Sequence, residues 1–310
     1  MALPTTPAYL TLLREWLRQC DDSHSCNKRS VETEAFLPTR LLYVGNTNDP
    51  DSLRLNVATG VDRAKYIALS HRWGTLSDDE KKEFCTTKDN VDQRLSGFNI
   101  SSLPKTFQDA IKVTRALHVP YLWIDSLCII QAGDNGKDWE SESRRMESVF
   151  SSAYCIIAAT SARDMKEGFL DRKVSPEHLY VQDTSGQRSY ICAVTDDFGV
   201  DVDKAELNTR AWVMQERVLS RRSVHFSANQ MYWECGQGVY CENLTAMKRY
   251  ELIRKTKILL ITTLCFLAHS GKTTSCLIQT FRTGSSLQAP HVPWSSFTSF
   301  ARITQSVVLQ

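Results

Sequence analysis

The sequence predicts an α/β protein with a parallel-sheet core, because short apolar segments alternate with stretches of helical spacing. The apolar segments are residues 66–70, 121–124 and 154–159. One helix is expected between the first two segments, and a helix over 138–152 is expected before the third. This alternation is typical of right-handed βαβ units, so we expect a parallel α/β core over residues 64–163.

Residues before this core are expected to add a helix and two strands. Residues 8–19 have the apolar spacing of a helix. Residues 41–44 and 53–57 are expected to form a hairpin around a long polar loop. We therefore expect residues 1–63 to form an N-terminal helix and hairpin that pack on the core.

The helix between the first two core strands has a recognisable start. Ser101 or Ser102 can cap it, and Pro104 lies in its first turn, where proline removes no internal hydrogen bond. The stretch from Leu76 to Asn99 is polar and is expected to be a connection.

After residue 163 the pattern changes to short strands and one helix. These elements are expected at 178–182, 189–194, 208–219, 223–226 and 231–235. They predict an added α+β layer over 164–243, which would complete a domain over 64–243. Residues 244–310 have no clear amphipathic pattern, so we expect an irregular or divergent tail.

Composition argues against several classes of protein. A net charge of +2 without a long basic block does not favour nucleic-acid binding. The longest apolar stretch, 258–268, has roughly half of the ~20 residues that a membrane span needs. The chain start lacks a signal-peptide pattern, so the 10 cysteines are expected to be reduced thiols of a cytoplasmic protein.

Polar side chains follow the core strands directly. Ser70, His71, Arg72 and Trp73 follow the first strand, and Asp125 follows the second. Because ligands of open α/β sheets bind where the strands end, we expect these residues to line one shared crevice. The alternatives are a structural turn for the first group and capping of the next loop for Asp125.

Glu142 falls inside the apolar stripe of the helix expected over 138–152. An ionised carboxylate on an apolar face needs a partner. One interpretation is a structural ion pair with Arg145, Arg72 or Arg210. The other is a functional carboxylate with a perturbed pKa.

Cys20, His24 and Cys26 are residue types that suit zinc, but the sequence shows no evident fourth ligand. A polar helix end is the favoured interpretation, so we predict no metal site. Cys128 lies in an apolar run and is expected to be a core residue rather than a nucleophile.

Five blocks stand in order along the chain, at 66–74, 103–111, 121–131, 153–162 and 209–217. Together they resemble the fungal heterokaryon-incompatibility (HET) domain, and the resemblance covers roughly residues 16–243. It implies a cytoplasmic fungal protein of allorecognition whose domain triggers programmed cell death. Its expected partners are further copies of itself and other cell-death signalling proteins.

HET domains are thought to be distantly similar to TIR domains, which are flavodoxin-like, self-assemble and in some lineages hydrolyse NAD. The resemblance therefore implies a TIR/flavodoxin-like parallel sheet for the α/β core over residues 64–163. That similarity makes Glu142 the candidate catalytic residue and NAD the candidate substrate, with no other cofactor expected. The candidate ligand-binding residues are Ser70, His71, Arg72, Trp73, Asp125 and Arg210. Two alternatives remain open: a non-enzymatic interaction module and a degenerate, truncated family member.

Overall fold

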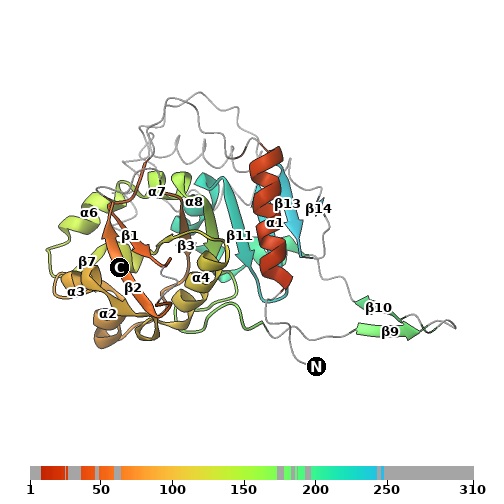
Figure 1. Ribbon diagram of the computed structural model, residues 1–310, viewed down its shortest axis with the longest axis horizontal. Helices are drawn as coiled ribbons and strands as arrows, with labels where there is room; N and C mark the ends of the chain where they lie inside the picture. The colour runs from red at the N-terminus through yellow and green to blue at the C-terminus, as the bar shows by residue number, and fades with distance from the viewer. Residues whose placement is uncertain are drawn as a thin grey trace, which may run out of the picture. The chain divides into compact units, whose positions relative to one another are not determined.

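In the computed structural model of the protein, the described residues are organised around one mixed sheet of ten strands (Figure 1). The structure describes residues 8–24, 26, 36–45, 49–58, 64–172, 178–182, 186, 188–192, 197–242 and 246–247. The strand order is β14-β13-β12-β11-β8-β3-β6-β1-β2-β5. The strands span β1 Arg40–Tyr43, β2 Ser52–Val57, β3 Tyr66–Ser70, β5 Phe98–Asn99, β6 Tyr121–Trp123, β8 Cys155–Ala158, β11 Arg222–Phe226, β12 Met231–Cys235, β13 Gly238–Cys241 and β14 Ala246–Met247.

Four central strands are parallel to one another. β3 pairs with β6 on one side and with β8 on the other, and β8 pairs with β11. Numbered as they occur in the chain, these four strands lie in the order 2-1-3-4, which is the start of the flavodoxin-like order. The α/β fold class is therefore confirmed, and the parallel strands are its centre.

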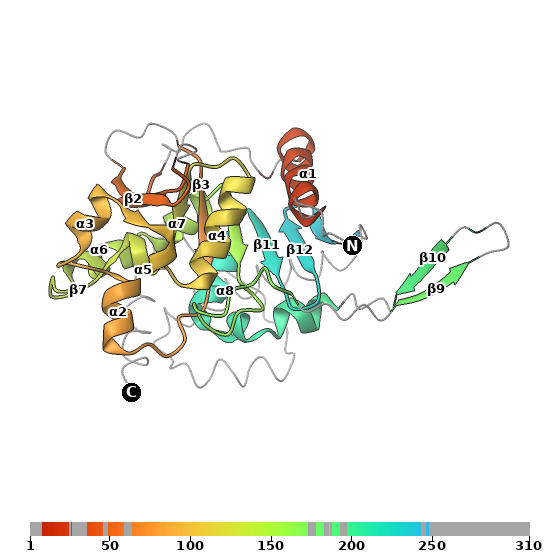
Figure 2. The same cartoon turned by 60° about the horizontal axis from the view of Figure 1, so that its bottom comes forward.

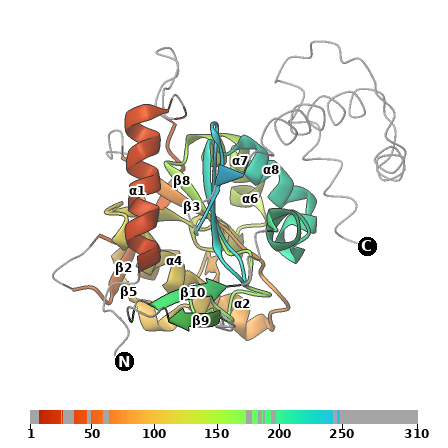
Figure 3. The same cartoon turned by 90° about the vertical axis from the view of Figure 1, so that its right-hand side faces the viewer.

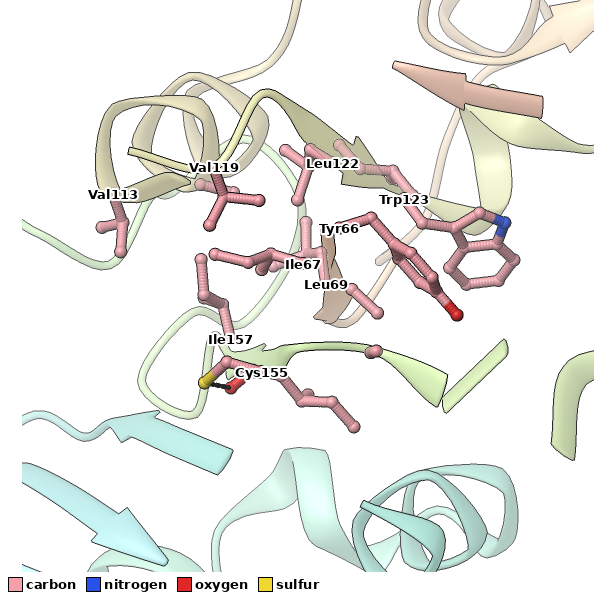
Figure 4. Packing of buried hydrophobic residues seen from close by; sticks show 14 of the residues in the cluster. Tyr66, Ile67, Leu69, Val113, Val119, Leu122, Trp123, Cys155 and Ile157 are labelled. Carbon is pink, nitrogen blue, oxygen red and sulfur yellow. Dashed lines mark hydrogen bonds between the residues drawn. The ribbon is translucent and has the colours of Figure 1, made fainter. Parts of the chain in front are cut away.

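The central strands form because their residues are apolar on both faces. Every residue of β3 and of β8 is buried, as expected for parallel strands covered by helices. Figure 4 shows Ile67, Leu122 and Ile157 from three adjacent strands gathered near Val113 and Val119. This packing is the main hydrophobic core.

Helices cover both faces of the sheet. The helices span α1 Ala8–Ser23, α2 Asp78–Phe84, α3 Val91–Ser96, α4 Lys105–Ala116, α5 Asp125–Cys128, α6 Lys137–Ser143, α7 Met146–Ser152 and α8 Ala211–Leu219. Figure 3 shows α1 and α8 on opposite sides of the sheet. The connections between parallel strands run through α4, then α6 and α7, then α8.

The N-terminal expectations agree with the structure. The helix extends over α1, and β1 pairs with β2 as an antiparallel hairpin. β1 also pairs with β6, so the hairpin extends the core sheet.

The segment after residue 163 differs from the expected added layer. β11 lies parallel to β8, and β12 and β13 continue the same sheet. The hairpin pattern of β11 and β12 is local and was visible in the sequence, whereas the pairing with β8 joins distant residues. A separate pair is formed by β9 (His178–Gln182) and β10 (Arg188–Cys192). Apart from 246–247, the expected tail lies outside the described residues.

Three local expectations were wrong. The helix expected over 138–152 is two helices, because the amide of Arg145 bonds to the carbonyl of Glu142, three residues back, and closes α6. Pro104 stands at the N-cap of α4, while Ser101 and Ser102 belong to a preceding 3₁₀ turn. The polar connection contains α2 and α3.

The start of α2 shows why the connection is partly helical. The Ser77 hydroxyl accepts the amide of Glu80, whose carboxylate accepts the amide of Ser77. This capping box stabilises a short exposed helix without an apolar stripe. In the part of the chain that the structure describes, no helix is long and apolar enough to cross a membrane.

Candidate functional site

The carboxyl ends of β3, β6 and β8 lie at one edge of the sheet, because these strands are parallel. The strand order reverses at β3, which has the later β6 on one side and the still later β8 on the other. In doubly wound sheets ligands bind at such a switch point. Ser70 ends β3 and Asp125 follows β6, so both stand at this position.

His71 is enclosed beside this edge. Its ring packs edge-on against Phe107, with 5.0 Å between the ring centroids. Its Nδ1 lies 3.9 Å from Oδ1 of Asp125. Burial lowers the pKa of His71, and the nearby carboxylate of Asp125 opposes this effect only in part. The imidazole is therefore neutral at physiological pH.

Asp125 connects the ends of β3 and β6. Its Oδ2 accepts a hydrogen bond of 2.9 Å from Nε1 of Trp73, and its Oδ1 accepts the amide of Ser126 at 2.7 Å. The two strand ends therefore converge as the sequence predicts. The bond to the amide of Ser126 is the loop capping that the sequence offers as the alternative for Asp125. Asp125 therefore both caps its own loop and binds the distant Trp73.

Gly74 sets the turn that places Trp73. Its φ is +71°, and a Cβ at this position would lie 2.4 Å from Cβ of Asp164. Any other residue would require both a left-handed backbone and a shift of the Asp164 segment. The chain can leave β3 along this path only with glycine.

Glu216 reaches the same edge from α8. Burial raises the pKa of its carboxyl group to about 7, against a smaller lowering effect of the Ser70 hydroxyl. Asp125 raises this pKa further, and Arg210 lowers it. Glu216 retains some exposure as a residue, but its Oε2 is buried. A carboxyl group that titrates near neutrality is suited to acid–base chemistry.

Arg210 stands at the N-cap of α8 and is exposed. Its Nη1 lies 3.4 Å from the backbone carbonyl of His71, a long hydrogen bond. The structure thus brings Arg210 to the edge.

Several buried polar atoms at this edge have no hydrogen-bond partner within the protein. They are Ser70 Oγ, His71 Nε2, Ser126 Oγ and Glu216 Oε2. The Ser70 hydroxyl is close enough to the Glu216 carboxyl group to lower its pKa, but the two form no hydrogen bond of ordinary geometry. An unpaired buried polar group costs roughly 1–3 kcal/mol, so a cluster of them requires an explanation. We call Ser70, His71, Asp125, Ser126 and Glu216 the switch-point edge.

Two predicted site residues point elsewhere. Arg72 forms an ion pair with the exposed Glu206. Glu142 is buried, and its Oε1 accepts the Thr39 hydroxyl at 2.6 Å and Nη1 of Arg145 at 3.2 Å. Within the described residues, no hydrogen bond or ion pair joins Glu142 to the switch-point edge. The structural ion pair is therefore the arrangement found for Glu142.

Sequence reasoning missed parts of the site. No local pattern in the sequence places Glu216 beside Ser70, because the two residues are far apart in the chain. Ser126 carries no local signal either, since a lone serine after a strand is common. Cys128 is buried in the core as expected, and burial raises the pKa of its thiol to about 12.

The cysteine and histidine group of the N-terminal segment forms a second cluster. Cys20, His24 and Cys26 lie beside Cys235, where β12 ends. Sequence reasoning missed Cys235 because it is separated from the other three by most of the fold.

Comparison with known families matches residues 66–216 to the family described as heterokaryon incompatibility protein (HET). The matched segment begins with β3 and ends at Glu216, so it contains the whole switch-point edge. No match was found among curated proteins or among solved structures.

Proposed function

Because the chain belongs to the heterokaryon incompatibility family through residues 66–216, we propose that it triggers programmed cell death in allorecognition, using the switch-point edge to bind a polar ligand. The family supports the role in heterokaryon incompatibility. How the domain acts in that role is our proposal: it self-associates, hydrolyses a bound ligand and so triggers cell death. The compartment we propose is the cytoplasm, because the buried cysteines Cys85, Cys128 and Cys155 are free thiols, as in a reducing compartment.

The observation that carries this proposal is the cluster of unpaired buried polar atoms at the switch-point edge. A hydroxyl-rich ligand would supply partners for the Ser70 and Ser126 hydroxyls. The exposed guanidinium of Arg210 would attract a phosphate. Sugar hydroxyls beside phosphates describe a nucleotide, and NAD is such a molecule.

The proposed reaction is hydrolysis of NAD to ADP-ribose and nicotinamide. The bond between the ribose C1′ and the pyridinium nitrogen breaks, and its electron pair stays with nicotinamide. Water forms the new bond to C1′ and gives its proton to the Glu216 carboxylate. A neighbouring carboxylate, Asp125, would stabilise the positive charge that develops on the ribose.

Glu216 replaces Glu142 as the proposed catalytic residue. A group that titrates near pH 7 is ionised in a large fraction of molecules at neutral pH and still accepts a proton readily. Glu142 is instead held by Thr39 and Arg145, and its side chain is 5% exposed. These contacts leave it a structural role.

The test is nicotinamide release by the full-length protein at high concentration with NAD. We expect Glu216→Gln to lower the rate by about 100-fold or more, while Glu142→Gln retains release. Glu140→Gln, which changes an exposed acid on the same helix as Glu142, is the matched control.

Loss of release in Glu142→Gln with normal release in Glu216→Gln would overturn the residue assignment, provided both variants remain folded. Absence of release from the wild-type protein, while it assembles in light scattering and kills cells, would support the interaction module instead. A protein that neither assembles nor kills would be the degenerate family member.

A further inference from the structure

A second group of reactive side chains lies where α1 meets β12. Cys20 is in the last turns of α1, His24 and Cys26 follow this helix, and Cys235 ends β12. The sulfur and nitrogen atoms that these residues offer all lie within 4.8 Å of one another. Three thiols and an imidazole have therefore been brought together from two distant parts of the chain.

Packing holds this group in place. Trp16 of α1 stacks on Trp233 of β12, with 6.4 Å between ring centroids and 30° between ring planes. Figures 1 and 2 show α1 beside the β11–β13 end of the sheet. Cys20 is 0% and Cys235 is 3% exposed, while His24 and Cys26 are half-buried. The position of each ligand atom thus follows from the docking of α1.

The backbone after β12 is arranged for negatively charged sulfur. The amide of Gln237 donates to Sγ of Cys235 at 3.5 Å, and the backbone of Gly236 passes close to Sγ of Cys26. A Cβ on Gly236 would lie 2.9 Å from Sγ of Cys26, so glycine permits this close approach. Backbone amides aimed at ligand sulfurs are the supporting contacts that metal-bound thiolates need.

We propose that this group binds one structural zinc ion, which joins α1 to β12. Three cysteines and one histidine are a common ligand set of structural zinc. A tetrahedron with metal–sulfur bonds of about 2.3 Å has edges of roughly 3.8 Å, so small side-chain rotations close the group around an ion. All four positions are taken by protein ligands, which leaves none for a substrate.

A disulfide explains the group less completely. Two of the three cysteines could pair, but the third thiol and His24 would then stand beside the bond without a role. Sγ of Cys235 lies 3.6 Å from Nδ1 of His24, a contact that a shared metal accounts for directly.

The site lies outside the segment that defines the family. Cys20, His24 and Cys26 precede residues 66–216, and Cys235 follows them. The ion would therefore connect the two flanks of the matched domain and fix α1 over the end of the sheet. This role does not depend on the proposed NAD chemistry.

The first experiment measures zinc in the untagged full-length protein, purified under reducing conditions without chelator. We expect about one zinc per chain, lost in Cys26→Ser and Cys235→Ser. Cys85→Ser is the matched control and should retain the ion, because Cys85 lies outside the group and is as buried as Cys235. His24→Cys should also retain zinc, since four cysteines form a zinc site, whereas His24→Ala should not.

Two further readouts apply if a variant folds poorly. Cobalt(II) added to the reduced, metal-stripped wild-type protein should give the absorption bands of a tetrahedral thiolate site. A strong chelator should lower the melting temperature of the wild type by roughly 5 °C or more. It should lower the melting temperature of Cys85→Ser by the same amount. No zinc together with no cobalt spectrum, or zinc that survives Cys235→Ser, would overturn the proposal, and a disulfide found on thiol titration would replace it.

Discussion

Replacing Glu216 by glutamine should stabilise the fold at high pH. Burial raises the pKa of this carboxyl group from 4.5 to about 7 in the folded protein, while the unfolded chain keeps a value near 4.5. Between these two values the folded state binds more protons than the unfolded state, so its stability falls as pH rises. Below about pH 4 both states are protonated, and the effect vanishes.

The size of the effect follows from the two pKa values. A difference between 4.5 and about 7 corresponds to about 3 kcal/mol of unfolding free energy once the pH exceeds both. Glutamine keeps the shape and the hydrogen-bonding capacity of the side chain without the charge. We therefore expect Glu216→Gln to be more stable than the wild type by up to about 3 kcal/mol at pH 8, which is roughly 6–12 °C in melting temperature.

Urea unfolding at several pH values between 4 and 8 measures this difference. Glu140→Gln is the control, because it changes an exposed ion pair with Arg144 and should alter stability by less than about 1 kcal/mol at every pH. A Glu216→Gln variant that is less stable at pH 8, or whose difference from the wild type is the same at all pH values, would refute the reasoning.

Three other changes have defined outcomes. Arg145→Met removes the ion-pair partner of the buried Glu142 and leaves it the hydroxyl of Thr39. Because Arg145 is 38% exposed, solvent weakens this pair, and we expect the free energy of unfolding in urea to fall by about 1–2 kcal/mol. No change in this free energy would contradict the ion pair. Gly168 has φ +79°, and a Cβ at this position would lie 2.7 Å from Oδ2 of Asp109, so Gly168→Ala should lower the free energy of unfolding by about 2 kcal/mol or more. Gly136 has a similar φ of +71° but free space around it, so Gly136→Ala should lower it by only about 1 kcal/mol. Equal losses in urea unfolding would show that crowding at Asp109 is unimportant. Burial lowers the pKa of His71, so below about pH 6.5 the unfolded chain binds a proton that the folded protein does not. As the pH falls, the free energy of unfolding should therefore decrease less steeply in His71→Gln than in the wild type. Identical slopes of stability against pH would argue against a buried neutral imidazole.

The central strands could be predicted because their signal is local. Residues 66–70 and 154–159 are apolar runs bounded by polar residues, and they became β3 and β8. The residues at the strand ends followed from the same logic, since parallel strands end at one edge. Trp73 and Asp125 meet there.

The contacts of the two proposed sites could not be predicted in the same way. Helical periodicity correctly predicted that Glu142 faces the core, but it could not predict that Thr39 and Arg145 bind its carboxylate there. Glu216 comes from a helix that joins the edge only after β11 pairs with β8. Cys235 reaches Cys20 only because Trp16 packs on Trp233. Each of these contacts depends on packing between distant segments of the chain, which local sequence patterns do not predict.

Viability of fungal cells that express the protein tests the central claim most directly, namely that the switch-point edge carries the activity of the domain. Wild-type protein, Glu216→Gln and Glu142→Gln are expressed at matched levels, with Glu140→Gln as the control. We predict that Glu216→Gln alone loses killing. Killing that persists in Glu216→Gln but disappears in folded Glu142→Gln would contradict the account.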